Sequence, residues 1–235
     1  MHYSKTLLVA LSTLALAACG GSDGDSSDKD GGGQVVAHGY YTLDYAPVGD
    51  YYSLHTTQVP HGVDSGEVKL GNHTVKFSGA NDTLAVDGYR HIIIGDEFSA
   101  QEGGLLLCKD EDSDEINTNW HAILPANAQA LEGDVSLLKG QSFQVYVDCE
   151  TSDDVRVVFD EDGNITDEDG DVTTAEEVAA MLSEDGLVRD EDGYTVTTRM
   201  RLYQSGDRLF IIGLGHDEED GETELLVLEQ LSSEE

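Results

Sequence analysis

Basic residues are scarce in this chain of 235 residues, which contains 12 Lys and Arg against 48 Asp and Glu and has a formal net charge of −36. Nucleic acids and anionic membrane surfaces are bound by clustered Lys and Arg, so the composition argues against both kinds of electrostatic partner. We therefore predict no nucleic-acid partner, and a soluble, strongly acidic surface that attracts cations.

Catalytic sequence motifs are also missing. The chain has no GxSxG, no Walker loop, no GxGxxG after a strand and no HExxH. His55, His61 and His73 lie close in the sequence, but their spacing does not match paired metal ligands. We therefore expect no enzyme, no cofactor and no metal site. The alternative is an enzyme whose residues meet only in space, which a single sequence does not reveal.

Cysteine is rare, and the first cysteine comes directly after a short apolar run. The segment MHYSKTLLVALSTLALAAC has a positive charge at Lys5 and apolar residues from Leu7 to Ala18. This run is too short to span a bilayer comfortably and is typical of a signal peptide. The sequence therefore predicts an exported protein.

The end of that run, Leu16-Ala17-Ala18-Cys19, resembles the lipobox of bacterial lipoproteins. The resemblance implies a signal peptide over residues 1–18, cleavage before Cys19, a diacylglycerol on the Cys19 sulfur and a fatty acyl chain, such as palmitate, on its amino group. Gly20 takes the place of the Asp that retains enteric lipoproteins in the inner membrane. The resemblance therefore implies the outer membrane, with the protein facing the periplasm or the cell surface. The alternative is an ordinary secretory signal with a chance cysteine.

Residues 19–34 comprise the lipidated cysteine and a tether. The stretch GGSDGDSSDKDGGGQ contains no apolar residue, so it has nothing to bury and is predicted to be disordered. As a flexible coil it has a reach of about 20 Å. It would hold a folded domain just off the membrane.

Cys108 and Cys149 remain after lipidation and are predicted to form a disulfide. An exported chain folds in an oxidising compartment, and no CxxC spacing or Cys–His pattern indicates a metal pair or a catalytic thiol. Both cysteines end strand-like runs, GLLLC and FQVYVDC. In the second run Cys149 falls on the same face as Phe143, Val145 and Val147, so we expect it to point with them.

Residues 35–231 have the two-residue period of β-strands. In YTVTTRMRLY, Met200 and Leu202 alternate with Arg199 and Arg201, which predicts a half-buried strand. This strand is followed by a turn at Ser205-Gly206-Asp207 and then by two further strand-like runs, RLFIIGL and TELLVLEQL. The order predicts an antiparallel meander. We predict a mainly β fold, an antiparallel sandwich or barrel-like meander, formed either as one domain or as two subdomains joined near 125–135.

One helix is predicted near 175–184. Thr174 and Glu177 form a capping box, apolar residues recur on one helical face, and Gly186 can end the helix.

The segment before that helix, DEDGNITDEDGDVTTAEE from Asp160 to Glu177, invites comparison with a calcium-binding EF-hand loop. Two alignments fail at the first ligand position, where Ile165 or Val158 offers no oxygen. The repeated DEDG recurs before Tyr194, where a strand begins at once. We therefore predict turns built on Asp-Gly, with a calcium-binding β protein as the alternative.

These features together predict a membrane-anchored binding or structural module. Its partners are the membrane, through the lipid on Cys19, and a small apolar ligand or a protein. The tyrosine-rich runs YYSLHTT and GYYTLDY would line a ligand pocket or simply fill strand positions.

Overall fold

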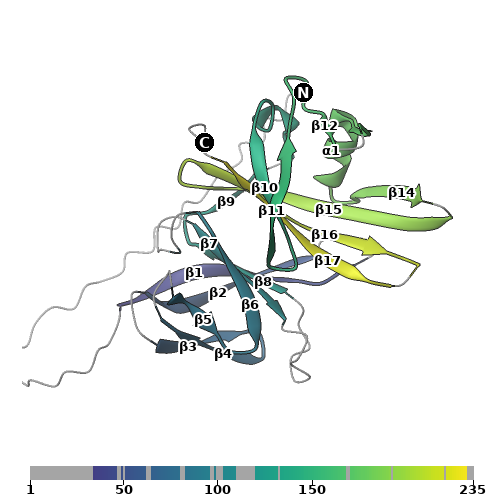
Figure 1. Ribbon diagram of the computed structural model, residues 1–235. Coiled ribbons are helices and arrows are strands. Elements are labelled where there is room, and N and C mark those ends of the chain that lie inside the picture. Colours follow the sequence, from purple (N-terminus) through teal and green to yellow (C-terminus); the bar gives the residue numbers. More distant parts are fainter. Residues whose placement is uncertain are drawn as a thin grey trace, which may run out of the picture. The chain divides into compact units, whose positions relative to one another are not determined.

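Strands dominate the computed structural model of the protein (Figure 1). The structure describes residues 34–46, 49, 51–61, 65–79, 83–95, 98, 103–109, 120–131, 133–167, 170–191, 193–219 and 221–231. The predicted signal peptide, Cys19 and all of the predicted tether except Gln34 lie outside the described residues. Gln34 itself begins the first strand.

Sheet A has five antiparallel strands in the order β2-β1-β8-β7-β6. These strands are β1 (Gln34–Leu43), β2 (Tyr52–His61), β6 (Tyr89–Ile94), β7 (Gly104–Lys109) and β8 (Trp120–Pro125). Sheet B is smaller and contains β3 (Ser65–Leu70), β4 (His73–Ser78) and β5 (Ala85–Val86). Both sheets come from the N-terminal half of the domain.

Sheet C is built from the C-terminal half and has the order β11-β10-β17-β16-β15-β14. Its strands are β10 (Ser142–Val147), β11 (Glu150–Val158), β14 (Leu187–Glu191), β15 (Tyr194–Ser205), β16 (Arg208–Asp217) and β17 (Thr223–Gln230), with β9 (Gln129–Leu131) also paired to β15. The predicted meander is confirmed, because β15, β16 and β17 are consecutive antiparallel neighbours. The described strands form open sheets and no closed barrel.

Three apolar clusters hold these sheets together. Core 1 combines side chains of sheets A and C, including Leu106, Trp120, Phe210 and Val227. Core 2 combines side chains of sheets A and B, including Leu105, Leu107, Val75 and Phe77. Core 3 lies on the other face of sheet C and includes Phe143, Phe159, Leu202 and Ile211. Sheet A is therefore covered on both faces.

Strand β7 explains why the run GLLLC does not alternate with polar residues. Leu106 and Cys108 belong to core 1, whereas Leu105 and Leu107 belong to core 2. A strand buried on both faces needs apolar side chains at every position. Residues 125–135 then carry the chain from sheet A to sheet C, and core 1 joins side chains from both sides of this segment.

Strand β15 is more buried than the sequence predicts. Leu202 and Met200 pack in or against core 3, as expected for the apolar face of a half-buried strand. The opposite face carries Arg199, which is only 2% exposed, and Tyr203, which lies in core 1. The prediction of a half-buried strand was therefore wrong at this end of β15, because sheet A covers the face that carries the arginines.

The predicted helix is α1 (Ala175–Met181), and its capping box is present. Thr174 Oγ1 accepts the N–H of Glu177, while the Glu177 carboxylate accepts the N–H of Thr174 at 2.8 Å. Val178 is buried in core 3. The helix ends at Met181, a few residues short of the predicted end. The remaining short elements are a 3₁₀ turn, η2 (Val135–Leu137), and an antiparallel pair of strands, β12 (Ile165–Thr166) and β13 (Val172–Thr173).

Cys108 and Cys149 form the predicted disulfide, with Cα atoms 5.8 Å apart. The expected orientation of Cys149 was wrong. It belongs to core 1, whereas Phe143 and Val145 belong to core 3. The reason is that Cys149 has left the strand and forms the β10–β11 turn with Asp148, at φ angles of 60° and 48°. The alternation of strand side chains does not continue through a turn.

Candidate functional site

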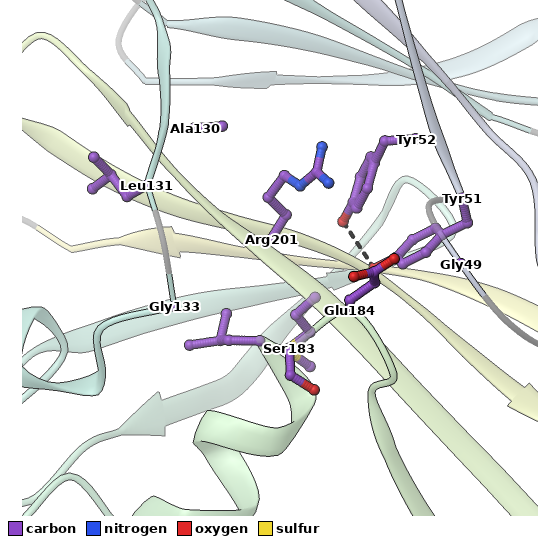
Figure 2. A pocket seen from close by; sticks show the side chains of 11 residues that line it. Gly49, Tyr51, Tyr52, Ala130, Leu131, Gly133, Ser183, Glu184 and Arg201 are labelled. Atoms are coloured by element: carbon purple, nitrogen blue, oxygen red, sulfur yellow. Dashed lines mark hydrogen bonds between the residues drawn. The ribbon is translucent and has the colours of Figure 1, made fainter. Parts of the chain in front are cut away.

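A pocket of about 540 Å³ lies where four separate segments meet (Figure 2). The β1–β2 connection and the first residue of β2 supply Gly49, Tyr51 and Tyr52, and β15 supplies Met200 and Arg201. The remaining lining residues come from β9 and the chain after it, and from the chain after α1: Ala130, Leu131, Gly133, Leu182, Ser183 and Glu184. Its volume is in the range of small-molecule sites.

Two adjacent tyrosines form one wall of this pocket. Tyr52 donates a hydrogen bond to the carbonyl of Ile212, and Tyr51 donates one to the Tyr52 hydroxyl oxygen at 3.0 Å. Their ring centroids are 4.2 Å apart. Burial, and to a lesser extent Tyr51, raises the pKa of Tyr52 well above its ordinary value, so this side chain stays neutral. The wall is aromatic and is fixed to sheet C.

Arg201 brings a positive charge to the tyrosine wall. Its guanidinium carbon lies 4.3 Å from the centroid of the Tyr52 ring, a distance typical of a cation–π contact. Figure 2 shows the Arg201 side chain extending from β15 beside the Tyr52 ring. Because the stack limits the rotamers of Arg201, its guanidinium is held in one place at the pocket.

Arg199, two residues earlier on the same strand, holds the pocket walls in position. Its guanidinium donates to the carbonyls of Ala46, Gly49 and Asp185. These bonds tie the β1–β2 connection and the segment after α1 to β15. Glycine at position 186 permits this approach, because a Cβ atom there would lie 2.4 Å from Arg199 Cγ. The φ angle of Gly186 is +74°, which glycine adopts more readily than other residues.

The remaining lining is largely apolar and carries one carboxylate, that of Glu184. Leu131, Leu182 and Met200 are apolar, and the lining residues include neither His nor Cys. The Ser183 hydroxyl donates to the carbonyl of Ala180 at 2.6 Å, which engages it with the end of α1. Throughout the described ranges, no cluster of three or more His, Cys, Asp or Glu is arranged to hold a metal ion. An aromatic wall, a fixed cation and apolar side chains are the usual components of a ligand pocket.

The tyrosine-rich runs contribute both to the pocket lining and to the packed core, the two roles that the sequence left open. Tyr51 and Tyr52 line the pocket, whereas Tyr40 fills core 2. The predicted site residues Cys108 and Cys149 lie together but outside the pocket lining, and Cys19 lies outside the described residues. Sequence analysis missed Arg201 and Glu184. The signal that could have found Arg201 was a pair of arginines on one face of a strand in a chain with few basic residues.

The acidic repeats form turns, as predicted. The Asp160 carboxylate accepts the backbone N–H groups of Asp162 and Asn164, both at 2.8 Å. A hydrogen bond from the Asn164 side chain is the largest cause of a lowered pKa at Asp160, and these backbone bonds lower it further. Asp167 accepts the N–H of Asp171 in the same way. The glycines of these turns, Gly163, Gly170 and Gly193, have φ angles of 93°, 90° and 96°.

No protein-family model, curated protein or solved structure matches this chain. In the part of the chain that the structure describes, no helix has the length and apolarity required to cross a membrane. The functional assignment therefore depends on the pocket and on the N-terminal motif.

Proposed function

We propose that the protein is a lipid-anchored binding module of the bacterial outer membrane, which holds a small ligand in the pocket at Tyr52 and Arg201. The anchor is supported by the resemblance of residues 16–19 to a lipobox, with Cys19 as the lipidated residue. The binding role is supported above all by one observation: four segments distant in the sequence converge on a pocket with a fixed cation over an aromatic ring.

The pocket favours a ligand with an apolar body and a group that accepts hydrogen bonds. Leu131, Leu182 and Met200 would contact the apolar body, while Tyr51 and Tyr52 provide a rigid wall. The Arg201 guanidinium would donate to the accepting group. A volume near 540 Å³ accommodates a small molecule better than a folded partner.

The fluorescent probe 1-anilinonaphthalene-8-sulfonate tests the pocket, since it joins an aromatic body to an anionic group. Ala130 is exposed and lines the pocket, so Ala130→Trp should fill it without removing a buried contact. We expect at least a tenfold weaker dissociation constant in this variant. Ala179→Trp is the matched control, because Ala179 is exposed on α1 and does not line the pocket. Equal binding by both variants would reject the pocket as the binding site.

The anchor is tested separately in cells. Cys19→Ser should abolish labelling by a fatty-acid probe and leave the precursor uncleaved. The isolated domain should still bind the fluorescent probe, because residues 20–33 separate Cys19 from the first strand, which begins at Gln34. Unchanged fatty-acid labelling would contradict the lipoprotein assignment without affecting the pocket.

A further inference from the structure

Histidines gather where sheets A and B meet. Strand alternation and ring contacts place the members of this histidine cluster on the surfaces that face each other: His38, His55, His73, His91 and His121. They are spread over β1, β2, β4, β6 and β8, so no local sequence spacing relates them. Histidine is the side chain whose charge normally changes between pH 5 and pH 8.

His121 is the buried centre of this cluster. Its side chain is 1% exposed, and its Nε2 atom has no hydrogen-bond partner among the described residues. Its Nδ1 atom lies 3.4 Å from the hydroxyl of Thr42. Its ring contacts the rings of Tyr40 and Tyr89, at centroid distances of 6.3 and 5.8 Å. The hydroxyl of Tyr89 is likewise buried, with no partner in the described part of the chain.

Among the described residues, the groups that sheets A and B present to His121 include no carboxylate to balance a proton on its ring. From sheet A, β1 presents Tyr40, β2 presents His55, β6 presents Tyr89 and His91, and β7 presents Leu107. From sheet B, β4 presents His73, while β3 and β5 present Val68, Leu70 and Val86. Burial, with smaller contributions from His73 and His55, lowers the pKa of His121 to about 4. In the closed structure a proton at Nε2 would be a buried charge with no acceptor in the described part of the chain.

We propose that the contact between sheets A and B is an acid-operated switch, in which uptake of a proton by His121 at Nε2 releases sheet B from sheet A. Release lets water reach the imidazolium and removes the cost of burying it. Histidine in an open state has a pKa near 6.5. Protons therefore bind the open state first as the pH falls, and the closed state loses stability between about pH 6.5 and pH 4.

Opening would break apolar contacts and hydrogen bonds between sheets A and B. Val68, Leu70, Val75, Phe77 and Val86 supply the apolar side of sheet B. Hydrogen bonds across the interface include the Gly71 N–H to the Tyr40 hydroxyl at 2.6 Å and the Thr57 hydroxyl to the Lys69 carbonyl at 3.3 Å. The disulfide joins β7 to the β10–β11 turn and does not cross this interface. Sheet B can therefore open while sheets A and C stay linked.

Hydrogen exchange of backbone amides tests the switch in the purified mature domain. After correction for the intrinsic exchange rate, the opening constant of β3 and β4 should rise about 50-fold between pH 7 and pH 4.5. Amides of β16 and β17 should not show this rise. His121→Gln, which stays neutral, should remove most of the pH dependence in β3 and β4, and the remainder belongs to His91, whose pKa is also lowered by burial. His216→Gln should preserve it, because His216 stacks on Tyr45 outside the histidine cluster.

A second measurement covers the case in which His121→Gln does not fold. The imidazole of His121 in the unmodified domain should titrate below pH 5 when monitored by nuclear magnetic resonance. Titration of His121 near pH 6.5, or an equal increase of exchange in β3–β4 and β16–β17, would overturn the proposal.

Discussion

The two faces of sheet A are closed by different chemistry. Toward sheet C, core 1 includes the two disulfide-bonded cysteines. Two buried charged residues, Arg199 and Glu229, accompany it, and the Glu229 carboxylate accepts from the Gly95 N–H at 2.7 Å, from Tyr146 and from Arg208. Toward sheet B, core 2 is accompanied by histidines, and the Nε2 atom of His121 has no partner among the described residues.

Burial alone therefore does not decide how each interface responds to pH or to a reductant. The guanidinium of Arg199 donates to carbonyl oxygens in the closed structure. His121 is neutral when closed and gains a charge only when it is released. The contact with sheet C should therefore be sensitive to reduction, and the contact with sheet B to acid.

Removal of the disulfide should have the largest effect. A bridge with a sequence separation of 41 stabilises by about 4 kcal/mol in the chain-entropy model. Replacing both cysteines, Cys108→Ala with Cys149→Ala, should lower the free energy of unfolding in urea by about that amount. The change should be the same at pH 7 and at pH 5, because neither residue titrates. A loss below about 1 kcal/mol would show that the bridge adds little to the contact with sheet C.

Acid should have the next largest effect. The pKa of His121 is about 4 in the folded protein and about 6.5 in the unfolded chain, so the unfolded chain takes up the proton first. Between pH 7 and pH 4 this difference should remove about 3 kcal/mol from the free energy of unfolding. Over the same pH range, the free energy of unfolding of His121→Leu should fall by about 3 kcal/mol less than that of the unmodified protein. Urea titrations at each pH would measure both values. If the free energy of unfolding changed with pH in the same way for both proteins, His121 would not be the source of the acid sensitivity.

Arg199→Ala should weaken the contact with sheet C by about 2–3 kcal/mol, independently of pH. The variant leaves the carbonyls of Ala46, Gly49 and Asp185 without their charged donor and removes the packed stem of the side chain. Arg156→Ala is the control, because Arg156 is exposed on β11. Thermal unfolding should separate the two variants by several degrees. Similar melting temperatures would mean that Arg199 is structurally dispensable.

Tyr40→Phe should produce the smallest change, about 1 kcal/mol, by removing the acceptor for the Gly71 N–H in the contact with sheet B. Tyr194→Phe provides a matched loss of a hydroxyl at an exposed site. Amide exchange at Gly71 should accelerate in Tyr40→Phe and stay constant in Tyr194→Phe. An unchanged rate at Gly71 would show that this hydrogen bond does not limit opening.

Features that depend on neighbouring residues could be predicted from the sequence alone. The two-residue period predicted the meander from β15 to β17, the capping box placed the start of α1, and the Asp-Gly turns needed glycine at positive φ. Cys108 and Cys149 were paired correctly because only these two cysteines remain after the predicted lipidation. Local backbone geometry and a small number of cysteines carry this information without reference to the rest of the fold.

Which polar side chains become buried depends on the packing of the sheets and could not be predicted from local sequence. Alternation places Arg199 and Arg201 on one face of β15, but it does not say that sheet A covers that face. The pocket and its supports depend on contacts between distant residues, such as Tyr52 with Ile212, 160 positions apart, and Arg199 with Ala46, 153 positions apart. The histidine cluster likewise combines separate strands. The physical reason is that strand periodicity determines which residues share a face, whereas the packing of one sheet on another determines what that face contacts.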